Sequence, residues 1–187
     1  MTEPRSALYN GVEVWPSLLF NEWKDTYATL HMWTQIVGKI RLVQSPFLNH
    51  WWHVPLYVTP RGLTTSVIPY GCLTFEINFD FVDHKLVINT SNGSTKTQEL
   101  RSQSVADFYR ETMAALLSVG IEVVIWTTPV EVADPIPFYE DYKHATYDRE
   151  YAQRFFSILV QASRVLTEFR SRFVGKVSPV HFFGAAL

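Results

Sequence analysis

The hydrophobic period of this chain changes from helical to extended after residue 43, and this change constrains the fold more than any other feature. On a helical wheel of about 100° per residue, residues 30–43 separate into two arcs. The apolar arc holds Leu30, Met32, Trp33, Ile36, Val37, Ile40 and Val43. The opposite arc holds His31, Thr34, Gln35, Gly38, Lys39 and Arg41, with Leu42 as its one apolar member. We expect an amphipathic helix here, beginning near Asp25 and Thr26, which can cap its first amides.

After residue 50 the apolar residues alternate with polar ones, as they do in half-buried strands. The clearest case is the segment 73–81. Its apolar positions are Phe75, Ile77, Phe79 and Phe81, and its polar positions are Glu76, Asn78 and Asp80. Further strands are expected over 51–59, 63–69, 85–90 and 95–100. Because Pro60-Arg61-Gly62 and Asn92-Gly93 are turn sequences, the pattern predicts an antiparallel meander of about five strands.

The second half of the chain contains two more predicted helices. Ser104 and Asp107 have the spacing of a capping box, and the helix that they open should end at Gly120. The last helix should begin after Asp148. Its apolar residues recur at helical spacing and are expected in the core: Tyr151, Phe155, Leu159, Ala162, Leu166, Phe169 and Phe173.

One or two further strands complete the predicted fold. The segment 121–127 is rich in β-branched residues, and 177–187 contains an apolar run after Pro179. Between them, 128–147 is expected to be a long loop with three prolines. The predicted fold class is therefore α+β, an antiparallel meander covered by three helices, in one domain of residues 1–187.

Composition excludes several classes of protein. Apolar residues make up 47% of the chain and charged residues 18%, which is too hydrophobic for intrinsic disorder. The net charge of −2 provides no attraction for nucleic acid. No apolar run approaches the roughly 18 residues of a membrane span, and the first residues lack a signal-peptide pattern. The one cysteine, Cys72, cannot form an internal disulfide. We therefore expect a cytoplasmic protein with neither a membrane nor a nucleic acid as partner.

The common catalytic motifs are missing from the sequence. It contains no GxxxxGK[ST], GxGxxG, HExxH, CxxC or GxSxG, which argues against P-loop, zincin and α/β-hydrolase chemistry. His50 and His53 are three residues apart on a predicted strand, so they would point to opposite faces. We predict no metal site, and expect His53 to be a packed histidine.

A polar stripe on the first helix is one half of the candidate binding site. His31, Gln35 and Lys39 lie four residues apart, which places them along one face of the helix. An ordinary solvent-exposed face is the alternative. However, Gly38 lies on the same arc, and a glycine inside a helix costs about 1 kcal/mol relative to alanine. Close approach of a ligand or of another backbone would explain that cost.

A second polar stripe lies on the predicted sheet. Glu76, Asn78 and Asp80 share one face of their strand, and His53 and Tyr57 lie on another strand. A half-exposed sheet produces such a stripe without any function. Together the two stripes would line one site, in which a carboxylate tunes a histidine for acid–base work. His144, Tyr147 and His181 are left without an assigned role.

Four segments carry a resemblance to known sequences. They are 27–39 (YATLHMWTQIVGK), 49–58 (NHWWHVPLYV), 79–84 (FDFVDH) and 178–183 (SPVHFF). They resemble a bacterial family catalogued as a domain of unknown function, and the likeness covers the whole chain. This resemblance implies no activity, cofactor or catalytic residue. Members of the family continue past the last segment, whereas this chain ends at Leu187, so the alternative is that it forms the N-terminal part of a longer architecture.

The sequence supports a binding function and does not identify a reaction. With 13 Phe, 9 Tyr and 6 Trp, the chain is expected to bind a small molecule in an aromatic and His-lined pocket, with or without catalysis. The loop 128–147 would cover that pocket. The alternative is a non-catalytic protein–protein interaction or structural module with an aromatic surface. Neither hypothesis specifies a cofactor or an oligomeric state.

Overall fold

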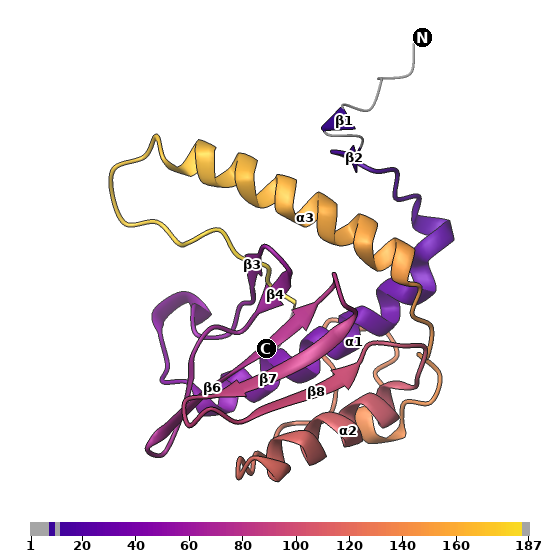
Figure 1. Ribbon diagram of the computed structural model, residues 1–187, viewed down its shortest axis with the longest axis vertical. Coiled ribbons are helices and arrows are strands. Elements are labelled where there is room, and N and C mark those ends of the chain that lie inside the picture. The colour runs from indigo at the N-terminus through magenta and orange to yellow at the C-terminus, as the bar shows by residue number, and fades with distance from the viewer. Residues whose placement is uncertain (1–7, 10–11, 185–187) are drawn as a thin grey trace.

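A six-stranded antiparallel sheet packs against helices in the computed structural model, which describes residues 8–9 and 12–184 (Figure 1). The strands are β3 (Tyr57–Thr59), β4 (Gly62–Thr64), β5 (Ile68–Tyr70), β6 (Leu73–Asp80), β7 (Lys85–Thr90) and β8 (Thr95–Glu99). Their order is β3-β4-β6-β7-β8, and β5 also pairs with β6. The helices are α1 (Phe20–Gln44), α2 (Val105–Ser118) and α3 (Arg149–Arg170). A separate hairpin joins β1 (Leu8–Tyr9) to β2 (Val12–Glu13). The α+β class and the antiparallel sheet are confirmed.

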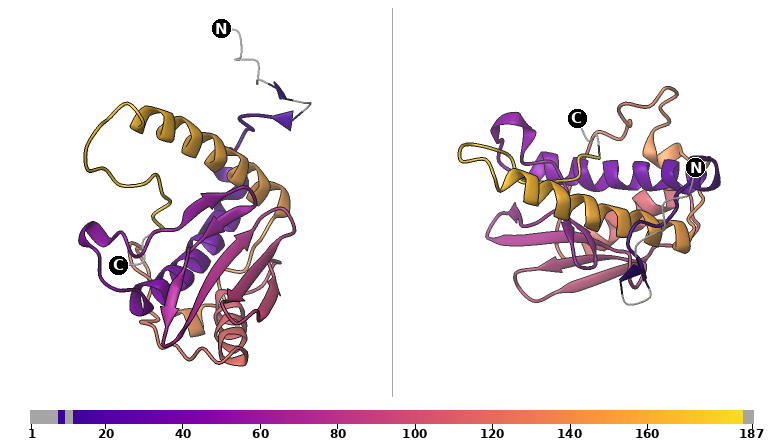
Figure 2. Two further views of the ribbon diagram at one scale, coloured as in Figure 1. Left: turned by 60° about the vertical axis from the view of Figure 1, so that its left-hand side comes forward. Right: turned by 90° about the horizontal axis from the view of Figure 1, so that it is seen from above.

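The sheet buries the apolar face that the alternation predicts. Along β6, Phe75, Ile77 and Phe79 are buried, and the polar residues between them are half-buried. Phe79 stacks on Phe108 of α2 at 6.4 Å between ring centroids, and Phe108 stacks on Trp33 of α1 at 4.5 Å. These aromatic contacts bring α1 and α2 to the same face of the sheet (Figure 2).

Helix α1 departs from the predicted amphipathic helix. It begins at Phe20, five residues before Asp25, and no side chain caps its first amides. Its polar arc is not solvent-exposed, because Thr34, Gln35, Gly38, Lys39 and Arg41 are all buried. Several segments cover this arc. Part of the loop 128–147 lies on the side of α1 that faces away from the sheet (Figure 2), and its Val130 bonds to Gln35. Gly184 lies against Thr34, and Arg41 bonds to the Pro55 carbonyl. The solvent-face interpretation of this arc is therefore wrong.

Two of the expected strands are shorter than predicted. Of the segment 51–59, only β3 is extended in the sheet, because His50 and Trp51 adopt left-handed φ angles of 56° and 58° in a short 3₁₀ turn. The segment 63–69 divides into β4 and β5 around Ser66, which also has a positive φ of 58°. Left-handed residues interrupt the regular pairing of a strand.

The segment 121–127 was predicted to be a strand, and this prediction is wrong. Its side chains do alternate, since Ile121, Val123 and Ile125 are buried and Val124 and Trp126 are exposed. However, the segment belongs to none of the strand pairs of the described sheet. Its apolar side chains reach the core although its backbone pairs with no strand of the described sheet. The alternation of apolar residues therefore reflects side-chain burial and not strand pairing.

The two later helices begin where their capping residues predict. The Ser104 hydroxyl accepts a hydrogen bond from the Asp107 amide, and the Asp148 carboxylate accepts from the first amides of α3. In α3, however, the expected apolar stripe is not the buried one, because the buried residues of this helix are Ala152 and Phe156. Tyr151, Phe155 and Leu159 are only half-buried. Phe169 is 74% exposed and Phe173, just past the helix, is 60% exposed. This end of α3 stands apart from the sheet (Figures 1 and 2), and its apolar residues line an open hollow beside the segment 176–181 instead of entering the core.

The C-terminal segment returns to the sheet edge but contributes a single bridge. Leu56 and Phe182 exchange two backbone hydrogen bonds, of 2.9 and 2.7 Å. The strand predicted over 177–187 is thus reduced to one pair in the described part of the chain, and 185–187 lie outside the described residues. The bridge places Phe182 beside α1 and α3.

Neighbouring valines test the packing of the segment 121–127. Val123 is 7% exposed and Val124 is 84% exposed. Val123→Ala should lower the free energy of unfolding by roughly 1.5–3 kcal/mol, the value of burying such a side chain. Val124→Ala should change it by less than about 0.5 kcal/mol. Urea denaturation of both variants measures the difference, and equal losses would contradict the alternating burial.

Candidate functional site

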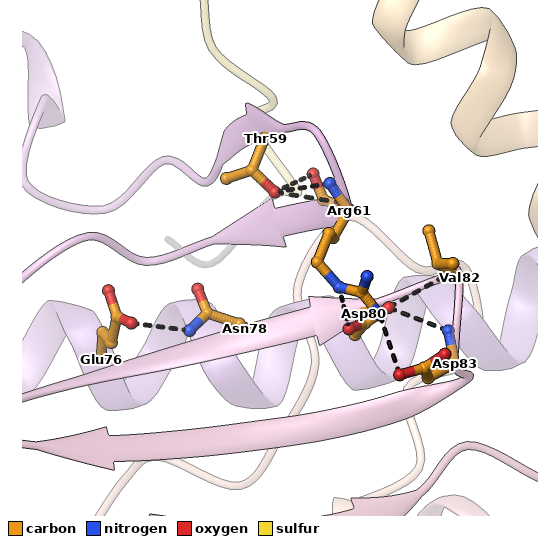
Figure 3. Close-up of polar contacts among 8 residues, drawn as sticks. Thr59, Arg61, Glu76, Asn78, Asp80, Val82 and Asp83 are labelled. Atoms are coloured by element: carbon orange, nitrogen blue, oxygen red, sulfur yellow. Dashed lines mark hydrogen bonds and ion pairs between the residues drawn. The ribbon is translucent and has the colours of Figure 1, made fainter. Parts of the chain in front are cut away.

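The polar stripe of strand β6 is bonded to other residues of the chain (Figure 3). The Glu76 carboxylate accepts hydrogen bonds from the side-chain amides of Asn78 at 2.9 Å and Asn89 at 3.1 Å. Asp80 accepts from Arg61 Nε at 2.6 Å and from two backbone amides of the following turn. The three polar residues of the stripe therefore already have partners within the protein.

Asp80 organises the turn that joins β6 to β7. Burial alone would raise the pKa of its carboxyl group, but the hydrogen bonds from Arg61 and from the amides of Asp83 and Val82 outweigh burial and lower this pKa. Arg61 also pairs with Asp83 at 2.8 Å. Asp80 is thus a carboxylate held in its charged form by a structural role in the turn.

His53 and Tyr57 lie near the end of α1. The buried His53 accepts a hydrogen bond at Nδ1 from the Leu48 amide, and burial lowers the pKa of its imidazole. Tyr57 is half-buried, and the Arg41 guanidinium lies 5.3 Å from the centre of its ring. Arg41 also donates to the Pro55 carbonyl. His53 is therefore packed and hydrogen-bonded, as expected.

The helix stripe contains the most informative contact of the candidate site. Gln35, which is fully buried, donates from Nε2 to the Val130 carbonyl at 2.8 Å and accepts at Oε1 from the Val130 amide at 2.9 Å. The same Nε2 lies 3.1 Å from His31 Nε2. Because the Gln35 amide nitrogen only donates, His31 Nε2 accepts. Lys39 is buried farther along the helix, and burial lowers the pKa of its ammonium group.

The eight predicted site residues do not form one cluster. His31 and Gln35 lie on the side of α1 that faces the loop 128–147, whereas the β6 stripe lies on the face of the sheet opposite its buried apolar residues. The core layer of Phe79 and its neighbours separates the two groups. The binding role of these eight residues stays a prediction. Because the helix stripe and the β6 stripe lie on opposite sides of the core, a single ligand would contact one stripe or the other.

An aromatic pocket lies next to His31, between α1, α3 and the C-terminal segment. It has a volume of about 310 Å³. Six aromatic residues line it: Trp23, Tyr27, Phe81, Phe155, Phe182 and Phe183. Its other lining residues include His31, Thr34 and Glu131, the last of which belongs to the loop 128–147. We call this the aromatic pocket.

Five rings follow one another around the aromatic pocket. The distance between ring centroids is 5.9 Å for His31 and Tyr27, 5.3 Å for Tyr27 and Trp23, and 5.2 Å for Trp23 and Phe155. Phe155 then meets Phe182 edge to face at 6.0 Å. The rings come from segments far apart in sequence, so the pocket exists only in the folded chain.

The sequence prediction found His31 but missed most of this pocket. Trp23, Tyr27 and His31 are spaced four residues apart, a signal that a helix beginning at Phe20 would have revealed. Placing the start of the helix near Asp25 left Trp23 outside it, and the wheel of residues 30–43 did not include Tyr27. Glu131 and Phe155 had no local signal, because only tertiary packing brings them to the pocket.

Two other histidines are paired outside the aromatic pocket. His144 Nδ1 lies 2.7 Å from the Asp141 carboxylate, which is buried and also accepts the amides of residues 143 and 144. His84 Nδ1 lies 2.8 Å from the Tyr147 hydroxyl, and burial raises the pKa of that phenol. The pair of His84 and Tyr147 connects the end of the loop 128–147 to the turn after β6. The pair of His144 and Asp141 lies within the loop, and the carbonyls of these two residues accept the amides of Val105 and Ala106 at the start of α2. His144 and Tyr147 therefore have a structural role.

Metal ligands do not gather anywhere in residues 8–9 and 12–184, where no three His, Cys, Asp or Glu side chains are placed to hold an ion. Across the same residues, every helix is too short or too polar to cross a bilayer.

Comparison with known proteins finds a match to the model of a family of unknown function (DUF5996) over residues 15–187. No curated protein and no solved structure matches the chain.

The lowered pKa of Asp80 makes a prediction about stability and pH. A carboxyl group with a lowered pKa in the folded state stabilises the fold above its ordinary pKa, and this contribution is lost as the pH falls through the folded value. Asp80→Asn should therefore lower the free energy of unfolding by about 1–2 kcal/mol near neutral pH. The difference from wild type should shrink below about pH 4. Urea denaturation at several pH values measures both effects.

Asp83→Asn is the matched control, because Asp83 shares Arg61 but its side chain is 57% exposed. This exposed pair should contribute less than about 1 kcal/mol. An Asp80→Asn variant as stable as wild type at neutral pH would show that Asp80 does not hold the turn.

Proposed function

The chain belongs to a family of unknown function, and we propose that it binds a small molecule in the aromatic pocket. The observation that carries this proposal is the series of rings from His31 to Phe182 around one hollow. Small-molecule sites are mostly apolar concave pockets of roughly 300–1,000 Å³ with a few placed polar groups. The aromatic pocket has such walls, and its polar groups include the His31 imidazole and the Glu131 carboxylate.

The aromatic pocket is a better candidate than the polar stripe of β6. The Glu76 and Asp80 carboxylates are engaged by side chains and amides of their own sheet, so a ligand would have to displace those bonds. His31 presents its ring to the pocket, and Gln35 behind it holds the imidazole from Nε2. We therefore assign ligand contact to His31, and a positioning role to Gln35.

The loop 128–147 acts as one wall of the proposed site. Both backbone groups of Val130 bond to Gln35, and the next residue, Glu131, lines the aromatic pocket. The predicted cover would thus be tied to α1 at Gln35 and again at Thr29, whose hydroxyl accepts from the Thr146 amide. Binding is the function proposed, and no reaction is assigned to His31.

A non-catalytic interaction module is the second candidate function, and one observation favours it. The end of α3 and the residues after it expose large apolar side chains: Leu166, Phe169, Phe173 and Val174. Contiguous exposed apolar surface often marks a site of protein–protein contact. This surface is separate from the aromatic pocket, so the two functions predict effects of different substitutions.

The small-molecule proposal is tested by ligand-observed NMR with a library of small aromatic and amine fragments. Tyr27 forms one wall of the aromatic pocket and is 43% exposed, so Tyr27→Ala should leave the fold intact. We expect Tyr27→Ala to weaken fragment binding about tenfold, which corresponds to about 1.4 kcal/mol. Tyr139→Ala removes a ring of similar exposure, 51%, from outside the aromatic pocket and should leave binding unchanged.

The proposal fails if no fragment binds at millimolar concentration, or if Tyr27→Ala and Tyr139→Ala have equal effects. In that case the exposed apolar end of α3 becomes the better-supported functional surface.

A further inference from the structure

We infer that the aromatic pocket recognises a small organic cation, such as a primary or quaternary amine, through its rings and the Glu131 carboxylate. This inference rests on the proposed function, because it specifies the class of molecule that the same pocket binds. It depends on three features of the pocket: the sign of its charge, the order of its rings and the fixed position of Glu131.

The charge of the aromatic pocket is negative. Among its described lining residues the ionisable groups are the Glu131 carboxylate, His31 and the Tyr27 phenol, and neither lysine nor arginine lines it. His31 Nε2 already accepts a hydrogen bond from the side-chain amide of Gln35. The imidazole can take a proton at Nε2 only if this hydrogen bond is broken first. Burial lowers the pKa of His31, and Glu131 offsets only part of that effect. With a neutral imidazole, the pocket carries the single negative charge of Glu131.

The rings of the pocket suit a cation. The faces of aromatic rings carry partial negative charge, and a cation within about 6 Å of a ring centroid is attracted to it. Trp23 gives the strongest such attraction among the aromatic residues, and it lies between Tyr27 and Phe155 in the series of rings. An ammonium group in the hollow would be close to several of these rings at once.

Glu131 is held in place by an unusual backbone. Its φ is 56°, in the left-handed region that costs a non-glycine residue roughly 1–2 kcal/mol. The residue before it, Val130, is bonded through both its amide and its carbonyl to Gln35. Strained residues of this kind persist where the surroundings determine them, and they gather at binding sites. The two bonds between Gln35 and Val130, which we call the clamp, therefore fix the backbone from which the Glu131 side chain reaches the pocket.

A neutral or an anionic ligand fits these features less well. A neutral aromatic molecule would contact the rings but would gain no attraction from the Glu131 carboxylate. An anion would be repelled by the same group. A cation satisfies the carboxylate and the rings together. The volume of about 310 Å³ is at the small end for ligand pockets, which favours a small amine over a nucleotide.

The test compares two probes of nearly the same shape and different charge. Choline carries a trimethylammonium group, and 3,3-dimethylbutan-1-ol carries a neutral tert-butyl group in its place. Isothermal titration or NMR titration of the full chain measures the affinity of each. We expect choline to bind at least tenfold more tightly than the alcohol.

Glu131→Gln isolates the contribution of the carboxylate. Glu131 is exposed, so the variant should fold, and thermal unfolding verifies this. We expect Glu131→Gln to reduce the preference for choline to threefold or less while leaving the affinity for the alcohol unchanged. Glu140→Gln removes another exposed carboxylate from the same loop and should keep the wild-type preference.

The possible failures are distinguishable. If the alcohol binds as tightly as choline, or if Glu131→Gln keeps the preference, the cation inference is wrong while small-molecule binding stands. If neither probe binds but a neutral or anionic fragment binds in a Tyr27-dependent manner, the cation inference is also wrong. If no fragment of any charge binds, the proposed function itself fails.

Discussion

The bonding of Gln35 to Val130 is the interaction on which the arrangement of the candidate site depends. A fully buried amide side chain pairs with both backbone groups of a residue 95 positions later in the sequence. Leaving such buried polar groups without partners would cost roughly 1–3 kcal/mol each. The pairing thus allows α1 to be covered on its polar side, and it turns the expected surface helix into the central helix of the fold.

Several features of the candidate site follow from this central helix. The loop that covers α1 carries Glu131 to the aromatic pocket, and the Gln35 amide keeps His31 oriented beside it. On the other side of α1, the aromatic contacts of Trp33 join it to α2 and the sheet. The bridge between Leu56 and Phe182 brings the C-terminal segment to the pocket, where Phe182 and Phe183 line it. The pocket is therefore a product of tertiary contacts made on both sides of one helix.

The sequence predicts the parts of the structure that depend on local patterns. The alternation in 73–81 identifies the buried face of β6, because four large apolar residues pin its register. It does not predict the burial of Gln35, since a wheel separates polar from apolar residues and contains nothing about a partner 95 residues away. In 121–127 the alternation is real but the strand is not, because a pattern of side chains does not specify a backbone partner. At Phe169, helical spacing predicts a common face but not whether another element covers it.

The amide hydrogen exchange of Val130 is the most direct measurement of the central claim. This amide donates to Gln35 Oε1 inside the protein, so it should exchange much more slowly than a free peptide, although it lies in a loop. In Gln35→Met, which keeps the side-chain volume but removes the amide, Val130 should lose its protection while the amides of β6 and β7 keep theirs. A Val130 amide that exchanges in the wild-type protein as fast as in a free peptide would contradict the clamp and the position of Glu131 that depends on it.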